Sequence, residues 1–216
     1  MLAIFDVEGV LYDAEYLPIL AEKINKEKEI WDITKKGIQG SINWEDGLTK
    51  RVELLKGIDF ETCKQVADSL PIMTGAREAC KTLKDAGWKI MAVSGGFTIM
   101  TDRLKDELNL DHVYTNELIF KDGKLDSVTI NVDSDKAKSA RVKIEEWNIP
   151  KDEIVVIVDG ANDIKLFDIC NLGIAYRAQD IVKDLATTTL EEKDLTKIIP
   201  IINQHYSMDL PIPVSS

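Results

Sequence analysis

The first eleven residues, MLAIFDVEGVL, constrain the fold of this chain more than any other stretch. The continuous apolar run 2–5 predicts a strand buried on both faces, as in a parallel sheet. Asp6 stands where that strand should end, and Glu8 follows two positions later. The carboxyl edge of such a sheet is where open α/β folds place their chemistry. Gly9 then allows a sharp turn or the close approach of a ligand. An ordinary surface turn with two acids is the alternative interpretation.

The rest of the chain divides into a helical block and an α/β block. Residues 14–70 show helical spacing of apolar residues and no strand signal, which predicts a small helical bundle inserted after the first strand as a cap. Strands and helices then alternate, which predicts an α/β, doubly wound, Rossmann-like parallel sheet built from residues 1–13 and 71–205. Within it, the segment 113–132 is predicted to form a β-hairpin appendage around an Asp-Gly turn. Residues 206–216 are expected to form an irregular tail.

The charge of the chain limits its partners. The 38 acidic and 27 basic residues give a net charge of −11, which argues against nucleic-acid and membrane partners because both require an electropositive face. The first strand begins at Leu2, so we expect no signal or transit peptide and a cytoplasmic protein, either a monomer or a homodimer. Only two histidines occur, so acid–base chemistry is expected to depend on carboxylates or lysine.

Polar residues follow three of the predicted strands. The first strand ends at Asp6 and Glu8, the strand 88–93 is followed by Ser94 and two glycines, and the strand 154–158 is followed by the acidic segment 159–163. Parallel strands bring these ends to one edge of the sheet. Clustered carboxylates repel one another unless a cation neutralises them, and oxygen-only ligands fit Mg²⁺, which also binds phosphate. The sequence therefore predicts a magnesium-dependent site for a phosphorylated small molecule.

These residues resemble the motifs of the haloacid dehalogenase (HAD) superfamily of phosphatases, and within it the phosphoserine phosphatase family. The segment 6–10 (DVEGV) is similar to the first motif, 94–96 (SGG) to the second, Lys138 to the third and 159–163 (DGAND) to the fourth. The segment 44–52 (WEDGLTKRV) is similar to a cap segment of that family. Four motifs in the family's order are far more specific than any one of them.

The resemblance implies a catalytic centre around Asp6. Asp6 would be the nucleophile that forms an aspartyl-phosphate, and Glu8 the general acid and then the general base. Mg²⁺ would be held by Asp6, Asp159 and the backbone carbonyl of Glu8. Asp163 would lie behind these ligands and orient Lys138 or a metal-bound water. The simpler interpretation of Asp159 and Asp163 is a helix N-cap and a first-turn acid.

The resemblance also implies the residues that bind the substrate, a small phosphomonoester. Ser94, the Gly95 amide and Lys138 would bind phosphoryl oxygens, and Asn162 would contact the phosphate or the substrate. In the cap, Glu15 would bind the substrate amine and Arg51 its carboxylate. These last two residues also fit an ordinary surface charge pair, and Lys138 also fits a solvated helix face. The implied reaction is hydrolysis of O-phospho-L-serine to L-serine and phosphate.

The chain departs from the family pattern at two positions. Glu8 stands where the family usually has aspartate, and Val158 where it usually has glycine. The second change is interpreted as packing. Glu8 keeps two alternatives open. A related bacterial enzyme with glutamate at this position can pass the phosphoryl group to homoserine. If Glu8 abolished turnover, the chain would be a catalytically silent regulatory protein. Phosphatase activity on another small phosphorylated metabolite is a further alternative.

Overall fold

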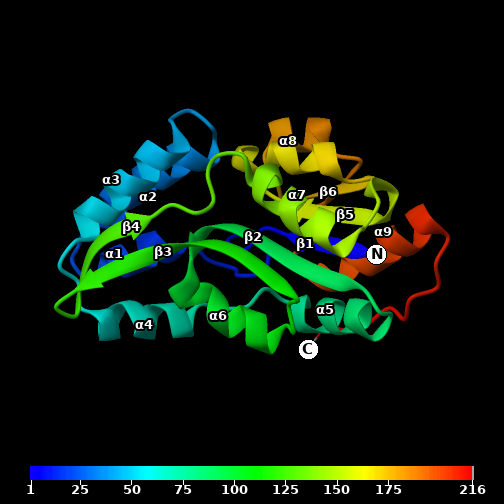
Figure 1. The fold of residues 1–216 in the computed structure, drawn as a ribbon, viewed down its shortest axis with the longest axis horizontal. Coiled ribbons are helices and arrows are strands. Elements are labelled where there is room, and N and C mark those ends of the chain that lie inside the picture. The colour runs from blue at the N-terminus through cyan, green and yellow to red at the C-terminus, as the bar shows by residue number, and fades with distance from the viewer. Residues whose placement is uncertain (216) are drawn as a thin grey trace.

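The computed structural model describes residues 1–215 and has a central seven-stranded sheet (Figure 1). Its strands lie in the order β4-β3-β2-β1-β5-β6-β7, and all neighbours pair in parallel except β3 and β4. The strands are β1 (Leu2–Phe5), β2 (Lys89–Phe97), β3 (His112–Lys121), β4 (Lys124–Thr129), β5 (Ile154–Val158), β6 (Leu172–Tyr176) and β7 (Thr188–Leu190). This arrangement confirms the predicted doubly wound α/β fold.

Helices cover both faces of the sheet. Figure 1 shows α5 and α6 on one face and α7 and α8 on the other. The α-helices are α1 (Tyr16–Glu22), α2 (Glu27–Ile38), α3 (Trp44–Leu55), α4 (Phe60–Ser69), α5 (Ala76–Asp85), α6 (Thr98–Glu107), α7 (Lys136–Trp147), α8 (Asp180–Leu185) and α9 (Ile198–Tyr206). Three 3₁₀ helices complete the elements of the described residues: η1 (Lys151–Glu153), η2 (Ala161–Ile169) and η3 (Leu195–Lys197).

The strand β1 forms the middle of the core, as its apolar run predicted. Ala3 and Phe5 point into the core on one face of the sheet, and Leu2 and Ile4 point into the core on the other. All four side chains are fully buried. Because both faces of β1 are covered, its position is fixed, and a residue directly after it is held in a defined place.

The helices α1 to α4 occupy the stretch between β1 and α5, where the sequence predicted a helical insertion. Side-chain caps begin two of them, because Asn43 accepts a hydrogen bond from the Asp46 amide and Asp59 accepts one from the Thr62 amide. Their apolar side chains join the same core as one face of the sheet. The division of the chain into a core domain and a cap domain at residues 14 and 70 stays a prediction.

The predicted hairpin is formed by β3 and β4, with a turn at Asp122 and Gly123. Its first strand also pairs with β2, so the hairpin extends the central sheet. The connection between α3 and α4 then covers the outer edge of β4: the Gly57 amide donates to the Leu125 carbonyl and the Leu125 amide donates to Ile58, each at 2.8 Å. These bonds pair an edge strand that would otherwise be exposed, and they fix the helical insertion to the sheet.

The chain beyond α9 has no regular structure up to residue 215, as expected for the tail. Leu210 exchanges two hydrogen bonds of 2.9 Å with the Asn203 side chain, which hold this segment against α9. Within the part of the chain that the structure describes, no helix is both long and apolar enough to cross a membrane.

Candidate active site

Asp6 lies directly after β1 and is 6% exposed. Its amide donates to the Ile157 carbonyl at 3.1 Å, which continues the pairing of β1 with β5 for one more residue. Its carboxylate forms an ion pair with Lys136, with 2.7 Å between Lys136 Nζ and Asp6 Oδ1. The same Nζ lies 2.5 Å from Asp163 Oδ1. The backbone of β1 and the Lys136 ammonium thus fix one oxygen of Asp6.

The lysine at this site is Lys136, so the assignment of Lys138 to the phosphoryl-binding position is wrong. The Lys136 side chain is 3% exposed, whereas that of Lys138 is 75% exposed and pairs with Asp133 on the surface. Residues two positions apart on a helix point in nearly opposite directions. Lys136 opens α7 and shares its buried face with Ala140, whereas Lys138 lies on the solvated face.

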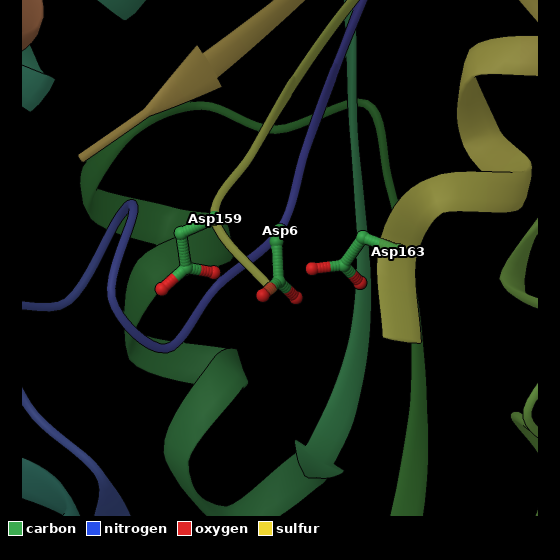
Figure 2. Close-up of side chains that lie close together, drawn as sticks. All are labelled: Asp6, Asp159 and Asp163. Atoms are coloured by element: carbon green, nitrogen blue, oxygen red, sulfur yellow. The ribbon is translucent and has the colours of Figure 1, made fainter. Parts of the chain in front are cut away.

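Three carboxylates meet at this edge of the sheet (Figure 2). Oxygens of Asp6, Asp159 and Asp163 lie within 4.8 Å of one another, and Asp6 stands between the other two. Burial and the Asp6 charge raise the pKa of Asp159 well above its ordinary value and that of Asp163 to about 7. Burial opposes the charge of Lys136, but its two carboxylate partners outweigh this and raise its pKa. The cluster favours a bound cation, and its all-oxygen donor set fits a hard divalent metal.

Gly9 makes room for this cluster. Its φ angle is +81°, which side chains rarely tolerate, and a Cβ there would lie 2.2 Å from Asp159 Oδ2. Glycine is therefore required on two independent grounds. The turn after β1 and the carboxylate after β5 pack directly against each other.

Glu8 points from the sheet edge toward α1. The Tyr16 amide, in the first turn of α1, donates to Glu8 Oε1 at 2.6 Å. Burial raises the pKa of Glu8, opposed by this hydrogen bond and by the charge of Arg51. A raised pKa means that the carboxyl group holds a proton more readily, as a general acid must. Glu8 therefore has the properties of an acid–base group, and it connects the sheet edge to the helical insertion.

Ser94 and Gly95 lie in the last part of β2, which continues to Phe97 rather than ending at Val93 as predicted. Ser94 is 1% exposed, and its Oγ accepts a hydrogen bond of 2.9 Å from the Gly96 amide. Because the hydroxyl accepts this bond, its own proton can be donated to a ligand. Trp44 of α3 packs over Gly95: a Cβ on Gly95 would lie 2.3 Å from the indole.

Arg51 of α3 is 4% exposed, although the sequence alone also allowed a surface role. Its Nε donates to the Gly47 carbonyl at 3.2 Å, its Nη1 donates to Thr34 Oγ1 at 3.1 Å, and its guanidinium lies 5.2 Å from the Trp44 ring. Burial lowers its pKa, opposed by the charges of Glu8 and Glu15. Burial and the neighbouring acid Glu8 raise the pKa of Glu15 well above its usual range.

A narrow cavity of about 20 Å³ lies between most of these groups, but Ser94, Arg51 and Asp163 are not part of its lining. Its lining consists of Asp6, Glu8, Glu15, Ile38, Trp44, Gly95, Lys136, Asp159 and Asn162. Asn162 also donates to Asp163 Oδ1 at 3.4 Å. The structure thus gathers residues from the ends of β1, β2 and β5, from α7 and from the helical insertion. Of the residues predicted for the site, Lys138 is placed away from it.

Comparison with known proteins identifies the family of this site. The model of the haloacid dehalogenase-like hydrolases matches residues 1–167, well over half of the chain. The chain belongs to the haloacid dehalogenase-like hydrolases. It is 36% identical over 206 residues to a phosphoserine phosphatase of Methanocaldococcus jannaschii, an alignment that covers 93% of this chain and 97% of the relative. It is 33% identical to the phosphoserine phosphatase of Archaeoglobus fulgidus, of which it spans 59%.

Solved structures agree with this hydrolase assignment. A phospho-aspartyl intermediate analogue of phosphoserine phosphatase matches with a TM-score of 0.90 at 34% identity, covering 93% of this chain and 97% of that one. A substrate-bound phosphoserine phosphatase complex matches with the same TM-score at 33% identity and the same coverage.

Three residues that line the cavity were not singled out by the sequence analysis: Lys136, Trp44 and the apolar Ile38. The apolar stripe of α7 carries a usable signal for the first, because Lys136 is spaced four and eight residues from Ala140 and Ile144 and so shares their face. No comparable signal marks Trp44, since its contact with Gly95 joins residues 51 positions apart in sequence (95 − 44).

Proposed function

We propose that this hydrolase is a Mg²⁺-dependent phosphatase that converts O-phospho-L-serine to L-serine and phosphate. The observation that carries the proposal is the buried Asp6 carboxylate, which has one oxygen fixed by Lys136 and the other available beside two further carboxylates. The relatives named phosphoserine phosphatase, over nearly the whole chain, support the choice of substrate.

The proposed reaction has two steps. The free oxygen of Asp6 attacks phosphorus while the bond from phosphorus to the serine oxygen breaks, and Glu8 donates a proton to that oxygen. Water then attacks phosphorus, Glu8 takes a proton from it, and the bond from phosphorus to Asp6 breaks to release phosphate. The raised pKa of Glu8 suits both transfers.

Metal binding is assigned to the carboxylate cluster. The side chains of Asp6 and Asp159 and the Glu8 carbonyl would hold Mg²⁺, with Asp163 behind them bonded to Lys136. When bound, Mg²⁺ supplies positive charge that offsets the repulsion between the nucleophile and the phosphoryl oxygens. The Lys136 ammonium holds one oxygen of the Asp6 carboxylate in place.

Substrate binding divides between the sheet edge and the cap. We assign the phosphoryl oxygens to the Ser94 hydroxyl, the Gly95 amide, Lys136 and Asn162, with Lys136 taking the place predicted for Lys138. Glu15 and Arg51 are assigned to the substrate ammonium and carboxylate. The cavity of about 20 Å³ is smaller than such a ligand, so we expect side chains or helices of the insertion that line it to move and admit the substrate.

The direct test is phosphate release from a panel of phosphomonoesters in the presence of Mg²⁺. We expect phosphoserine to be hydrolysed with a higher kcat/KM than phosphothreonine, phosphoethanolamine or glycerol phosphate. Removal of metal with EDTA should abolish release, and added Mg²⁺ should restore it. Equal turnover of every ester in the panel would contradict the proposal that phosphoserine is the substrate, but the protein would still be a phosphatase. If no ester were turned over, both proposals would be wrong.

Glu8 supports a second candidate, transfer of the phosphoryl group to homoserine. Its side chain is one methylene longer than the aspartate usual in the family, and its Oε1 is held by the Tyr16 amide, which places the acid–base group toward the cap. Added homoserine should then yield phosphohomoserine, and its absence would exclude this activity. Abolition of turnover by Asp6→Asn would exclude the silent regulatory alternative.

A cytoplasmic location, a monomeric or homodimeric state and the lack of nucleic-acid and membrane partners stay predictions from the sequence.

A further inference from the structure

Asn116, in the middle of β3, lies behind the phosphoryl-binding groups and has no side-chain contact of its own with the catalytic cavity. It is fully buried, with 0% exposure. A buried primary amide is costly unless its polar atoms are hydrogen-bonded, and Asn116 uses both ends of its side chain. The two ends reach different parts of the site.

The nitrogen of Asn116 controls the backbone beside Ser94. Its Nδ2 donates to the Gly95 carbonyl at 3.0 Å. That carbonyl belongs to the same peptide group as the Gly96 amide, which donates to Ser94 Oγ at 2.9 Å. Two consecutive glycines would otherwise leave this peptide free to rotate. One hydrogen bond from Asn116 therefore fixes the peptide plane that orients the Ser94 hydroxyl.

The oxygen of Asn116 controls the segment that leads to Lys136. Its Oδ1 accepts hydrogen bonds of 2.8 Å from the amides of both Asn131 and Val132. Val132 is fully buried, and the chain enters α7 at Lys136 four residues later. The loop before α7 is thus fixed to β3 at the point where it must place the lysine at the end of β1.

We propose that Asn116 is a positioning residue that sets the distance and orientation between Ser94 and Lys136, two of the groups assigned to phosphoryl oxygens. This inference rests on the proposed function. Its chemical consequence is specific: loss of the Asn116 amide weakens binding of the phosphoryl group and leaves binding of the amino-acid part unchanged. If Asn116 only formed hydrogen bonds with buried backbone groups, its loss would lower stability but would not weaken phosphoryl binding more than amino-acid binding.

The test uses two variants of the full chain. Asn116→Asp keeps the shape of the side chain and an acceptor for the two loop amides, and it replaces the donor to Gly95 with an oxygen. Asn116→Ser removes the amide without adding a charge and provides the measurement if the first variant does not fold. Asn109→Asp is the matched control, because it makes the same chemical change on an exposed asparagine that takes no part in these hydrogen bonds. Ile202→Ala, on the buried face of α9, is a second control, because it lowers the stability of the fold without changing a group of the site.

The measured quantities are kcat/KM for phosphoserine and phosphoethanolamine, and the inhibition constants of orthophosphate and of L-serine, with Mg²⁺ present. For the Asn116 variants we expect kcat/KM to fall roughly 10- to 100-fold for both esters, the scale typical of residues that orient functional groups through hydrogen bonds. The inhibition constant of orthophosphate should rise about tenfold and that of L-serine by less than about twofold. Both control variants should retain all four values within about twofold.

Unchanged orthophosphate inhibition in a folded Asn116 variant would overturn the inference and leave the proposed function in place, as would equal weakening of orthophosphate and L-serine. A wild-type protein that neither hydrolyses phosphoserine nor is inhibited by orthophosphate would contradict the proposed function and with it the role of Asn116.

Discussion

The sheet edge and the helical cap both place a buried cation at the site, but they treat it in opposite ways. Lys136 has two carboxylate partners, Asp6 and Asp163, within 2.7 Å. Arg51, among residues 1–215, forms no ion pair and donates instead to the Gly47 carbonyl and the Thr34 hydroxyl. Burying a cation without a counter-ion costs free energy, and proteins retain such groups where a ligand completes them. The sheet edge thus supplies the counter-ions of its cation from the chain itself, whereas the buried cation of the helical insertion has no direct ion-pair partner among the described residues, as expected if it binds the carboxylate of the substrate.

Removal of the Lys136 cation, which is paired with Asp6 and Asp163, should lower activity more than any substitution discussed below except that of Asp6 itself. We expect Lys136→Met to lower kcat/KM for phosphoserine by roughly 10²- to 10³-fold, the cost of losing one donor to a charged transition state. It should also lower the free energy of unfolding in metal-free buffer by about 3–5 kcal/mol, because Asp6 and Asp163 lose their counter-ion. Steady-state kinetics and urea denaturation measure the two effects.

Lys138→Met is the matched control for that variant, since it removes the same charge from the same helix at an exposed position. It should leave kcat/KM within about twofold and unfolding within about 0.5 kcal/mol of the wild type. A larger loss of activity from Lys138→Met than from Lys136→Met would reverse the assignment of the lysine.

Removal of the Arg51 cation, which forms no direct ion pair, should weaken substrate binding without lowering the stability of the fold. We expect Arg51→Met to raise KM for phosphoserine by roughly 10- to 100-fold, and KM for phosphoethanolamine, which lacks the carboxylate, by less than about threefold. Because Met removes a buried charge that forms no direct ion pair, the free energy of unfolding should stay within about 1 kcal/mol of the wild type or increase. Equal losses for both esters would show that Arg51 supports only the fold of the cap.

A smaller effect is expected from Gly9→Ala at the sheet edge. The new Cβ would press on Asp159 at a backbone angle that favours glycine, so the carboxylate must shift. We expect the Mg²⁺ concentration for half-maximal activity to rise roughly tenfold. Gly57→Ala is the control, because Gly57 also has a positive φ but no atom lies within 4 Å of its added Cβ. A rise in the Mg²⁺ requirement in both variants would mean that backbone strain, and not the contact with Asp159, is responsible.

The predictable part of the site is the part built on strand ends. The apolar run 2–5 determines a strand buried on both faces, so the position of Asp6 follows from local sequence. The same logic places Ser94 and Asp159, because parallel neighbours end at one edge. The helices after β1 were also recognisable from their hydrophobic periodicity, and the hairpin from its Asp-Gly turn.

The remainder depends on contacts that sequence patterns do not encode. The choice of Lys136 over Lys138 depends on which side of α7 packs against the sheet, for which the spacing of Lys136 from Ala140 and Ile144 gives only an indirect signal. The indole of Trp44 over Gly95 and the amide of Asn116 under it depend on segments that meet only in the folded protein. Short motifs therefore locate the reacting groups, and tertiary packing determines which neighbours orient them.

The central claim, that Asp6 attacks phosphorus, is tested most directly by trapping the phosphoenzyme. Acid quenching during turnover of phosphoserine with Mg²⁺, followed by borohydride reduction, converts an aspartyl-phosphate to homoserine, which peptide mass spectrometry detects. The account predicts homoserine at position 6 of the wild-type chain, absent from Asp6→Asn and from samples without substrate. Modification of a different residue, or turnover by Asp6→Asn at a rate comparable to the wild type, would contradict it.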